Sequence, residues 1–497
     1  MSRVHTSRQL KLGTGRCTSS AFRVALQSLV VVATSCLCNA SAADASPDGR
    51  GWEFEPYRIE VVIAIDAPGS LASWLAAELP LHLNRRATAA VGPAWELNVQ
   101  IADAVQRQIM LSDIAALSDP PGEAFPSDGD KLLLISLQCR PEGFDITARE
   151  FDRYVARWGM PIRRESRQLD MLAEQAFSLA WQAVAPLARF VTDANDRRRV
   201  VLQLRAGELP QPDPDAQWAQ TGDVFLPLVR RMTRSGELVE GGVQPVPWTY
   251  LEVIGSDGEA SRATIARVHS GTRQALPSHR QGRVEPIAIA LRADPGEAVL
   301  QLHARTAGDR PLVGYDVFVQ KPDKAAPERI ASSDTQGRVR VPAGDSRIQI
   351  LFVKNGGQLV ARFPLVSGTA PDVVDVPLPD DDMRLAAEAR LAAMREDVVD
   401  VVARRNILMA RARQKIEQSD FAAAQQLLQA LDELPGRAQF NLMLNTAARL
   451  LRSDDPQIQH RIDQLFEATR TIVNQFLDVR PIGQLHDELR EARRKQT

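Results

Sequence analysis

The sequence predicts a multidomain α+β protein, and three features support this fold class. A chain of 497 residues exceeds an ordinary single domain, for which about 150 residues is typical. The hydrophobic pattern changes along the chain from mixed helix and strand, to short strands, to helix alone. Polar stretches rich in Pro and Asp separate these regions. The predicted parts are an export signal at 1–42, an α/β domain at 52–191, a linker at 192–220, a small β-barrel-like module at 221–292, a β-sandwich at 293–378 and a carboxy-terminal helical domain at 383–495.

The first 42 residues have the pattern of a secretory signal peptide. Residues 1–24 are basic and polar, and 25–38 form an apolar run of about 14 residues. Ala40, Ser41 and Ala42 supply the small side chains that precede a cleavage site. A transmembrane anchor needs about 20 apolar residues, and no later stretch approaches that. The sequence predicts an exported protein, periplasmic or extracellular, cleaved near Ala42.

A lipid anchor is the less favoured alternative. Ala33, Thr34, Ser35 and Cys36 resemble a bacterial lipoprotein box, in which the Cys becomes the acylated mature terminus. The family pattern prefers Leu where Ala33 stands. Soluble export with a mature terminus near Ala43 is therefore the main prediction.

The formal net charge of −2 conceals an acidic body. Residues 1–42 contain no acid and five bases, so their removal changes the formal charge from −2 to −7. An acidic chain lacks the basic surface that binds phosphate backbones, and no nucleic-acid partner is predicted.

Cysteine usage excludes a disulfide framework within the exported part. Three of the four cysteines lie in the signal, which leaves Cys139 alone. Cys139 follows the apolar run 132–137 and is expected to be a small buried side chain. Packed cores must therefore stabilise the domains.

Residues 52–191 carry the strand and helix patterns of an α/β domain. Ser70 is a natural N-cap for the first helix, and Pro80 should break or kink it. A wide apolar stripe predicts a closing helix packed on a sheet. The expected strands lie at 57–65, 95–101, 131–138, 143–151 and 156–166, and the expected helices at 70–90, 105–117 and 169–190.

This order of elements resembles the α/β domain of the curli-secretion lipoprotein and of the amino-terminal part of the Tol-system propeller protein. In that family a strand commonly ends in an Asp-containing turn with the pattern D-x-x-x-G, and 152–159 occupies the corresponding place with a longer interval. The resemblance covers about 140 residues and contains no diagnostic motif. It implies an envelope-associated assembly or scaffold domain.

Two β-rich regions follow. Residues 193–220 are polar and Pro-rich and fit a linker, with one run at 200–204 that suggests an edge strand. Short runs separated by Gly turns then predict a small β-barrel or sandwich. These runs lie at 224–231, 246–254, 263–268 and 284–291.

Residues 298–378 alternate more cleanly between apolar and polar side chains. The segment 333–341 resembles the T-D-x-x-G-x-f-x-l turn of carboxypeptidase-regulatory-like and related immunoglobulin-like (Ig-like) sandwiches, with Ser333 in place of Thr. Asp334 can cap its own turn, and Gly337 supplies positive φ. The resemblance implies a structural or adhesive accessory module.

After Pro377 the chain becomes helical. Asp382 is a natural N-cap for a helix reaching about Gln418. Residues 419–431 resemble the second helix of a tetratricopeptide unit, but the pattern does not recur at a 34-residue period. A small bundle is therefore expected rather than a solenoid.

No catalytic residue, cofactor-binding residue, metal ligand or cofactor is predicted. The chain lacks G-x-S-x-G, GxxxxGK[ST], strand-linked GxGxxG and HExxH patterns. His269 and His279 flank one loop and form a minor hypothesis for a metal site. Trp158 and Trp248 are minor candidates for peptide or glycan contact. Arginine runs at 163–164, 197–199 and 230–231 have acids nearby and fit solvated surfaces.

These features favour an exported, non-catalytic scaffold or adaptor at the cell envelope that binds a protein or polymer partner. The alternative is a hydrolase of envelope or extracellular polymer whose site forms only in the fold. A concave pocket in 52–191 that holds two or more ionisable groups within hydrogen-bond reach would favour the hydrolase. An exposed apolar groove on the carboxy-terminal helices would favour the adaptor.

Overall fold

The computed structural model describes most of the chain after its first 50 residues. The predicted export signal, the lipoprotein-like Cys36 and His279 lie outside the described residues. The described ranges are 51–126, 128–193, 196–235, 237–256, 264–272, 276, 284–292, 296–306, 310–321, 326–368 and 373–496.

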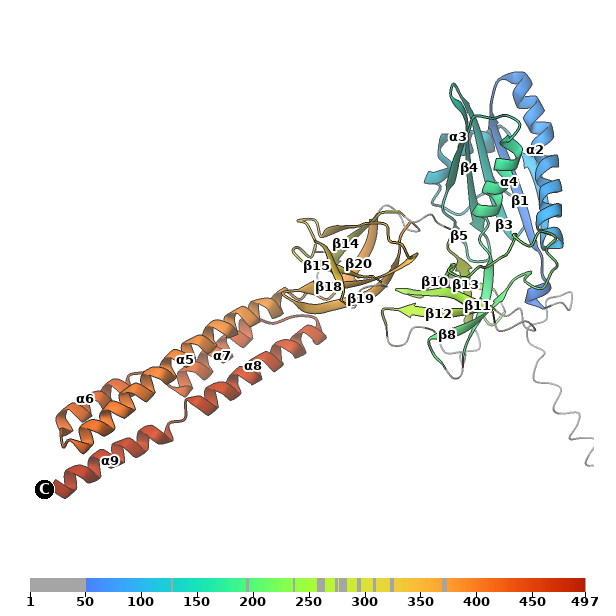
Figure 1. Ribbon diagram of the computed structural model, residues 1–497. Helices are drawn as coiled ribbons and strands as arrows, with labels where there is room; N and C mark the ends of the chain where they lie inside the picture. The colour runs from blue at the N-terminus through green and yellow to red at the C-terminus, as the bar shows by residue number, and fades with distance from the viewer. Residues whose placement is uncertain are drawn as a thin grey trace, which may run out of the picture.

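The described chain is a mixed α+β protein with several sheets and a carboxy-terminal helical region. Figure 1 shows an α/β domain above a barrel, then a smaller pair of sheets, then long helices that extend away from them. We call the α/β domain and the barrel together the head, and the helices after residue 381 the helical arm.

The first sheet has strand order β2-β1-β3-β4-β5, with β6 also paired to β4. β1 pairs in parallel with β2 and β3, and β3 pairs antiparallel with β4. Its strands are β1 (Tyr57–Asp66), β2 (Trp95–Ile101), β3 (Lys131–Arg140), β4 (Gly143–Asp152), β5 (Arg157–Trp158) and β6 (Ile162–Ser166).

Helices cover the two faces of this sheet unequally. α2 (Gly69–Ala90) and α4 (Leu172–Ala183) pack on one face, whereas α3 (Ala104–Asp113) packs on the other. Asp103 caps α3 in a reciprocal capping box with Gln106. Short 3-10 turns complete the domain at Trp52–Phe54, Gly92–Ala94 and Ile114–Ala116.

Two local predictions in this domain are wrong. Ser70 is not an N-cap, because α2 already begins at Gly69 after Pro68. Pro80 lies inside α2, which continues to Ala90 as expected, so Pro80 does not break the helix and a kink there stays a prediction. The region 156–166, expected as one strand, is two short strands separated at 159–161, where Pro161 cannot donate a ladder hydrogen bond.

The closing helix is shorter than the sequence predicts. α4 ends at Ala183, and Leu187–Thr192 is a strand, β7. Pro186 lacks an N–H and interrupts the helical hydrogen bonds. Leu187 and Phe190, which extend the apolar stripe in sequence, are buried in the sheet that follows.

That sheet closes into a six-stranded barrel. The ring runs β9-β11-β12-β8-β7-β13 and returns to β9, with β10 attached to β9. Residues 192–220, expected as a linker, therefore contribute a barrel strand at Arg199–Leu204. The strands are β7 (Leu187–Thr192), β8 (Arg199–Leu204), β9 (Val224–Met232), β10 (Leu238–Pro245), β11 (Thr249–Ser256), β12 (Thr264–Ser270) and β13 (Val284–Ala290).

The α/β domain and the barrel share one hydrophobic core. Leu228 and Ile287 of the barrel lie in the same buried cluster as Ile59 of β1 and Leu179 of α4. The Tyr57 hydroxyl accepts a hydrogen bond from the Leu187 N–H across this junction, at 2.8 Å. The head is therefore packed as one unit.

Two further sheets, of orders β17-β14-β20 and β16-β15-β18-β19, enclose a common core. The predicted turn forms: Asp334 accepts hydrogen bonds from the Gln336 and Arg338 N–H groups, and Gly337 has φ +73°. The strands are β14 (Ala298–Ala304), β15 (Asp316–Gln320), β16 (Glu328–Ser332), β17 (Arg338–Val341), β18 (Ile348–Asn355), β19 (Gln358–Val366) and β20 (Val373–Leu378).

The helical arm begins one residue earlier than predicted. Asp382 is the first helical residue, and Asp381 occupies the N-cap position. α5 spans about 54 Å at 1.5 Å per residue. The helices are α5 (Asp382–Glu417), α6 (Phe421–Asp432), α7 (Arg437–Leu450), α8 (Pro456–Phe476) and α9 (Arg480–Gln496). Within the described residues, no helix has the length and apolarity of a membrane span.

Candidate functional site

A first groove lies on the α3 face of the α/β sheet, within the described part of the head. α3 packs over β1 and part of β3, which leaves the β4 and β6 half of this face uncovered. The resulting groove has a volume of about 550 Å³. Strand alternation places Ser136, Gln138, Asp145, Thr147 and Arg163 on this face.

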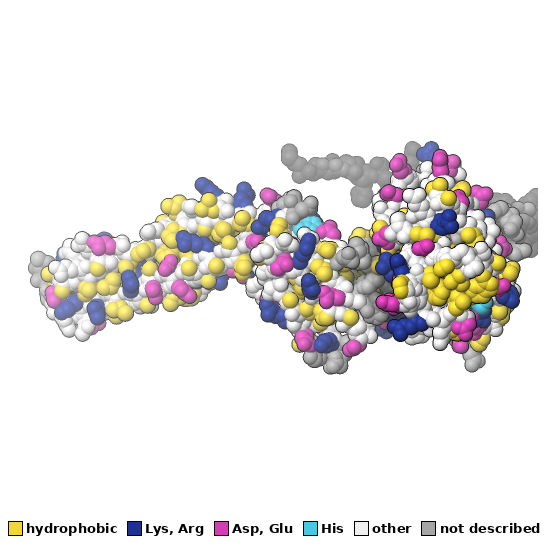
Figure 2. Space-filling view, turned by 90° about the horizontal axis from the view of Figure 1, so that it is seen from above, with side chains coloured by type: hydrophobic (Ala, Val, Ile, Leu, Met, Phe, Trp, Pro, Cys, Tyr) yellow, Lys and Arg dark blue, Asp and Glu magenta, His cyan; other side chains and the backbone are white. Residues whose placement is uncertain are grey.

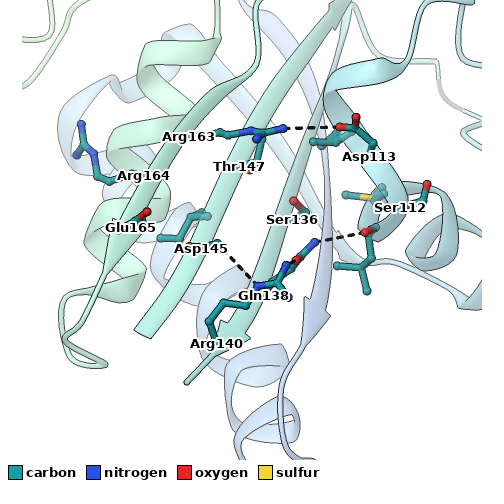
Figure 3. A pocket seen from close by; sticks show the side chains of 14 residues that line it. Ser112, Asp113, Ser136, Gln138, Arg140, Asp145, Thr147, Arg163, Arg164 and Glu165 are labelled. Atoms are coloured by element: carbon teal, nitrogen blue, oxygen red, sulfur yellow. Dashed lines mark hydrogen bonds and ion pairs between the residues drawn. The ribbon is translucent and has the colours of Figure 1, made fainter. Parts of the chain in front are cut away.

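Charged groups of both signs line this first groove (Figure 3). Arg140 Nε lies 3.4 Å from Asp145 Oδ2, and Arg163 Nη2 lies 3.7 Å from Asp113 Oδ1. Asp145 is also directly opposite Glu165 in the ladder between β4 and β6. The groove therefore offers both hydrogen-bond donors and acceptors to a polar ligand.

The first groove lacks a nucleophile with an adjacent base among its described lining residues. The Ser112 hydroxyl donates to the Ile109 carbonyl oxygen at 2.7 Å, so it is occupied within its own helix. Cys139, which follows Gln138 on β3, is half-buried. The geometry fits binding better than acyl transfer.

The second groove lies where the α/β domain meets the barrel, and its lining includes residues of β5 and β13. Its volume is about 580 Å³, within the range of small-molecule sites. The apolar part of its lining comes from both parts of the head: Leu117, Trp158, Met160, Pro161, Ile289 and Leu291.

Three guanidinium groups line the second groove. Arg149 donates through Nε and Nη1 to the carbonyl oxygens of Gly159, Ile114, Ala115 and Leu117, at 2.8–3.0 Å. Arg292 Nη1 is 4.0 Å from Asp223, and its Nε is buried without a hydrogen-bond partner. The Arg157 side chain makes no hydrogen bond or ion pair with a residue that the structure describes, although Tyr250 lies close enough to interact with it electrostatically.

A buried ionic cluster underlies this groove. Lys131 Nζ contacts the carboxylates of both Glu150 and Asp152, and donates to the Ala185 carbonyl oxygen at 2.8 Å. Glu150 also accepts from the Ala185 N–H at 2.7 Å. All three charged side chains are almost completely buried. The cluster thus connects β3 and β4 to the segment that follows the end of α4.

Burial and charge balance explain the titration of this cluster. Burial raises the pKa of Glu150 to about 7. Asp152 adds to this effect, because two carboxylates face one ammonium group. Burial alone lowers the pKa of Lys131, but Asp152 and Glu150 outweigh it and raise that pKa. Burial also raises the pKa of Tyr57 to about 12.

Asp152 connects the cluster to the groove. Its Oδ1 accepts hydrogen bonds from the N–H groups of Tyr154 and Val155, at 2.9 and 3.1 Å. These bonds cap the turn before β5, in which Ala156 has φ 49°. This turn presents Arg157 to the second groove.

The minor candidates from the sequence occupy separate places. His269 contacts Glu252 at 2.7 Å, and no described cluster of three or more His, Cys, Asp or Glu side chains could hold a metal. Trp158 lines the second groove, whereas Trp248 packs on Phe363 with ring centroids 4.6 Å apart.

The arginine runs also separate. Arg163 and Arg164 both border the first groove, but the Arg164 side chain points away from it and donates to Ser178 at 3.3 Å. Arg230 binds Glu285 at 3.1 Å, and Arg199 lies 3.6 Å from Asp196. The sequence interpretation missed Lys131, although a lone lysine at the start of an apolar strand is a signal for a buried ion pair.

The chain matches no protein family model and no curated protein. Among solved structures it is similar to TolB from Acinetobacter baumannii, with 9% identity and a TM-score of 0.17, over 64% of this chain and 96% of that chain. It is also similar to the Bacillus anthracis TIE protein, with 9% identity and a TM-score of 0.15, over 44% of this chain and 46% of that chain. These similarities are consistent with a weak modular resemblance and carry no argument about function.

Proposed function

We propose that the protein is an exported, non-catalytic scaffold or adaptor of the cell envelope that binds a protein or polymer partner. One observation carries the proposal: the helical arm presents large apolar side chains to solvent. Leu442 and Leu450 of α7 are 67% and 75% exposed, and Val399 of α5 is 65% exposed. Figure 2 shows hydrophobic side chains along the surface of the arm.

The spacing of these side chains supports a docking surface. Leu442, Thr446 and Leu450 follow one another at four-residue intervals and lie on one face of α7. The opposite face, with Phe440, Leu444 and Ala447, already packs in the core of the arm. Exposed apolar side chains at helical spacing are typical of helices that bind partners.

The rest of the architecture suits the same role. The arm starts from a sandwich, for which we propose an Ig-like accessory module of the kind that the turn at 333–341 resembles. We also propose export, on the basis of the pattern in residues 1–42. A binding head, a spacer and a long arm would place two binding surfaces far apart.

Crosslinking in cells tests the adaptor. The double variant Leu442→Ser with Leu450→Ser should lose the crosslinked partners of the full chain from the envelope fraction. The matched control is Leu81→Ser on α2, a residue 60% exposed on the head, which should retain them. Equal crosslinking by the two variants, or turnover of a polymer substrate with no partner recovered, would contradict the proposal.

A hydrolase of envelope polymer remains the second candidate, and one observation favours it. Asp145 and Glu165 lie directly opposite each other on antiparallel strands, where Cβ atoms are about 4.5–5.5 Å apart. Most glycosidases use a pair of carboxyl groups, one as general acid and the other as nucleophile or base. Turnover of a polymer that both Asp145→Asn and Glu165→Gln abolish would favour this candidate over the adaptor.

A further inference from the structure

We propose that the second groove binds a monovalent carboxylate attached to an apolar group, with Arg157 as the principal contact. The chemistry required is a carboxylate on an acyl chain or at the carboxyl terminus of an apolar peptide. This ligand site goes beyond the proposed scaffold role, and it uses surface on the head rather than on the arm.

The charge balance of the groove calls for an anion. Its three guanidinium groups face two acids, and both acids are already occupied. Asp113 pairs with Arg163 at 3.7 Å and caps the Ala115 N–H at 2.9 Å. Glu150 is buried against Lys131. The lining therefore carries uncompensated positive charge.

The positive charge is concentrated at Arg157. Arg292 is partly balanced by Asp223, and Arg149 is held by backbone carbonyl oxygens. The Arg157 side chain is exposed at the groove and has no hydrogen-bond or ion-pair partner within the described chain. A planar guanidinium with free N–H groups matches the two oxygens of a carboxylate.

Partial desolvation of the guanidinium group strengthens its attraction for an anion. The surrounding atoms lower the pKa of both Arg157 and Arg292 by burial. A guanidinium that has lost part of its hydration gains more from a bound anion than a fully solvated one does. The turn capped by Asp152 fixes the backbone that leads into Arg157, so little backbone freedom is lost on binding.

The remaining lining selects an apolar body for the ligand. Trp158 is fixed by a hydrogen bond from its Nε1 to the Asp119 carbonyl oxygen at 2.8 Å, and it packs on Phe151. Met160, Ile289 and Leu291 complete an apolar wall that spans both parts of the head. Such a wall favours a hydrocarbon or an apolar side chain over a sugar.

Calorimetric titration of the full chain tests this site, with decanoate below its micelle concentration and a peptide ending in Leu-Leu with a free carboxyl terminus as the two probes. Methyl decanoate and the amidated peptide are the uncharged controls. Binding of decanoate alone identifies the acyl source, and binding of the peptide alone identifies the peptide source. Absence of binding by both charged probes, or equal binding of charged and uncharged forms, overturns the proposal.

Two arginine variants locate the binding. Arg157→Gln should weaken binding of the charged probe at least tenfold. Arg167→Gln, at an exposed arginine outside the groove, should leave the affinity unchanged. Because both side chains are exposed, neither substitution removes core packing, and circular dichroism confirms folding. Equal affinities of the two variants would show that the ligand does not contact Arg157.

Discussion

Lys131 lies at the junction within the head. Its ammonium group is completely buried and contacts two carboxylates from the adjacent strand. It also donates to Ala185, just after α4 ends. A single side chain therefore links the sheet to the segment that leads into the barrel.

Replacement of Lys131 by Met should destabilise the head by about 3–5 kcal/mol, because it leaves two buried carboxylates without a counter-charge. Urea unfolding followed by tryptophan fluorescence measures the change. The control is Arg140→Met on β3 of the head, where an exposed pair with Asp145 contributes about 1 kcal/mol or less. Similar losses in the two variants would mean that the buried cluster contributes no more than a surface pair.

Glu150 should make the stability of the head depend on pH. Its pKa is raised by burial from 4.5 to about 7 in the folded protein, so folding favours the protonated form. The stability from this group is fully present below about pH 4.5 and is lost as the pH rises through about 7. Glu150→Gln should remove this loss, which urea unfolding between pH 4 and 8 measures.

Asp130 supplies a control of opposite sign. Burial alone raises its pKa, but Arg205 and Arg58 outweigh burial and hold the pKa of Asp130 below its usual range. Its contribution to stability is therefore lost as the pH falls. If Glu150→Gln and Asp130→Asn change the pH profile in the same direction, the assignment for Glu150 is incorrect.

At the scale of elements, the periodicity of the sequence predicts helices and strands well but predicts long-range strand pairing poorly. The strands at 57–66, 95–101, 131–140 and 143–152 match alternating or continuous apolar runs. The end of α4 was missed because Leu187 and Phe190 extend its helical stripe although both belong to β7 of the barrel. Phe190 lies in the barrel core, and Leu187 lies in the core that the barrel shares with the α/β domain. Barrel closure depends on pairs such as β7 with β13, which local patterns do not encode.

The candidate site was less predictable than the elements. Arg157 follows a positive-φ turn, and Arg292 follows a barrel strand far along the chain. Only the docking of the barrel against the α/β sheet brings them to one groove. A single sequence shows each arginine, but it does not show which acidic side chains lie near that arginine in the fold.

The turn at Gly337 is a prediction from sequence that a substitution can test. Gly337 has φ +73°, and an added Cβ would overlap the Leu302 carbonyl oxygen. Gly337→Ala should therefore destabilise the sandwich by at least about 3 kcal/mol. Gly357 in the same sandwich has φ +83° with no atom near the Cβ position, so Gly357→Ala should cost about 1 kcal/mol. Thermal unfolding compares the stabilities of the two variants. Equal losses of stability would show that the approach of the added Cβ to the Leu302 carbonyl oxygen has no effect.

At the scale of the whole molecule, buried polar contacts fix the arm to the sandwich. Asp381 and Arg384 are both buried and joined by hydrogen bonds of 2.6–2.9 Å. Arg384 also donates to the Asn355 carbonyl oxygen at 2.9 Å, and the Asp381 N–H donates to the Tyr315 hydroxyl at 2.9 Å. Arg305 of the sandwich binds Asp455, the N-cap of α8, at 2.7 Å. These contacts favour a rigid arm direction.

Arg384→Ala should allow the arm to change its direction relative to the sandwich, because the substitution leaves Asp381 buried without its partner. We expect a broader distribution of distances within the molecule in small-angle scattering and faster proteolysis between the sandwich and α5, with helix content largely retained. Arg390→Ala, at an exposed position on the same helix, should match the parent in both measurements. If scattering and cleavage by Arg384→Ala also match the parent, the direction of the arm is set by the apolar cores rather than by the buried ion pair.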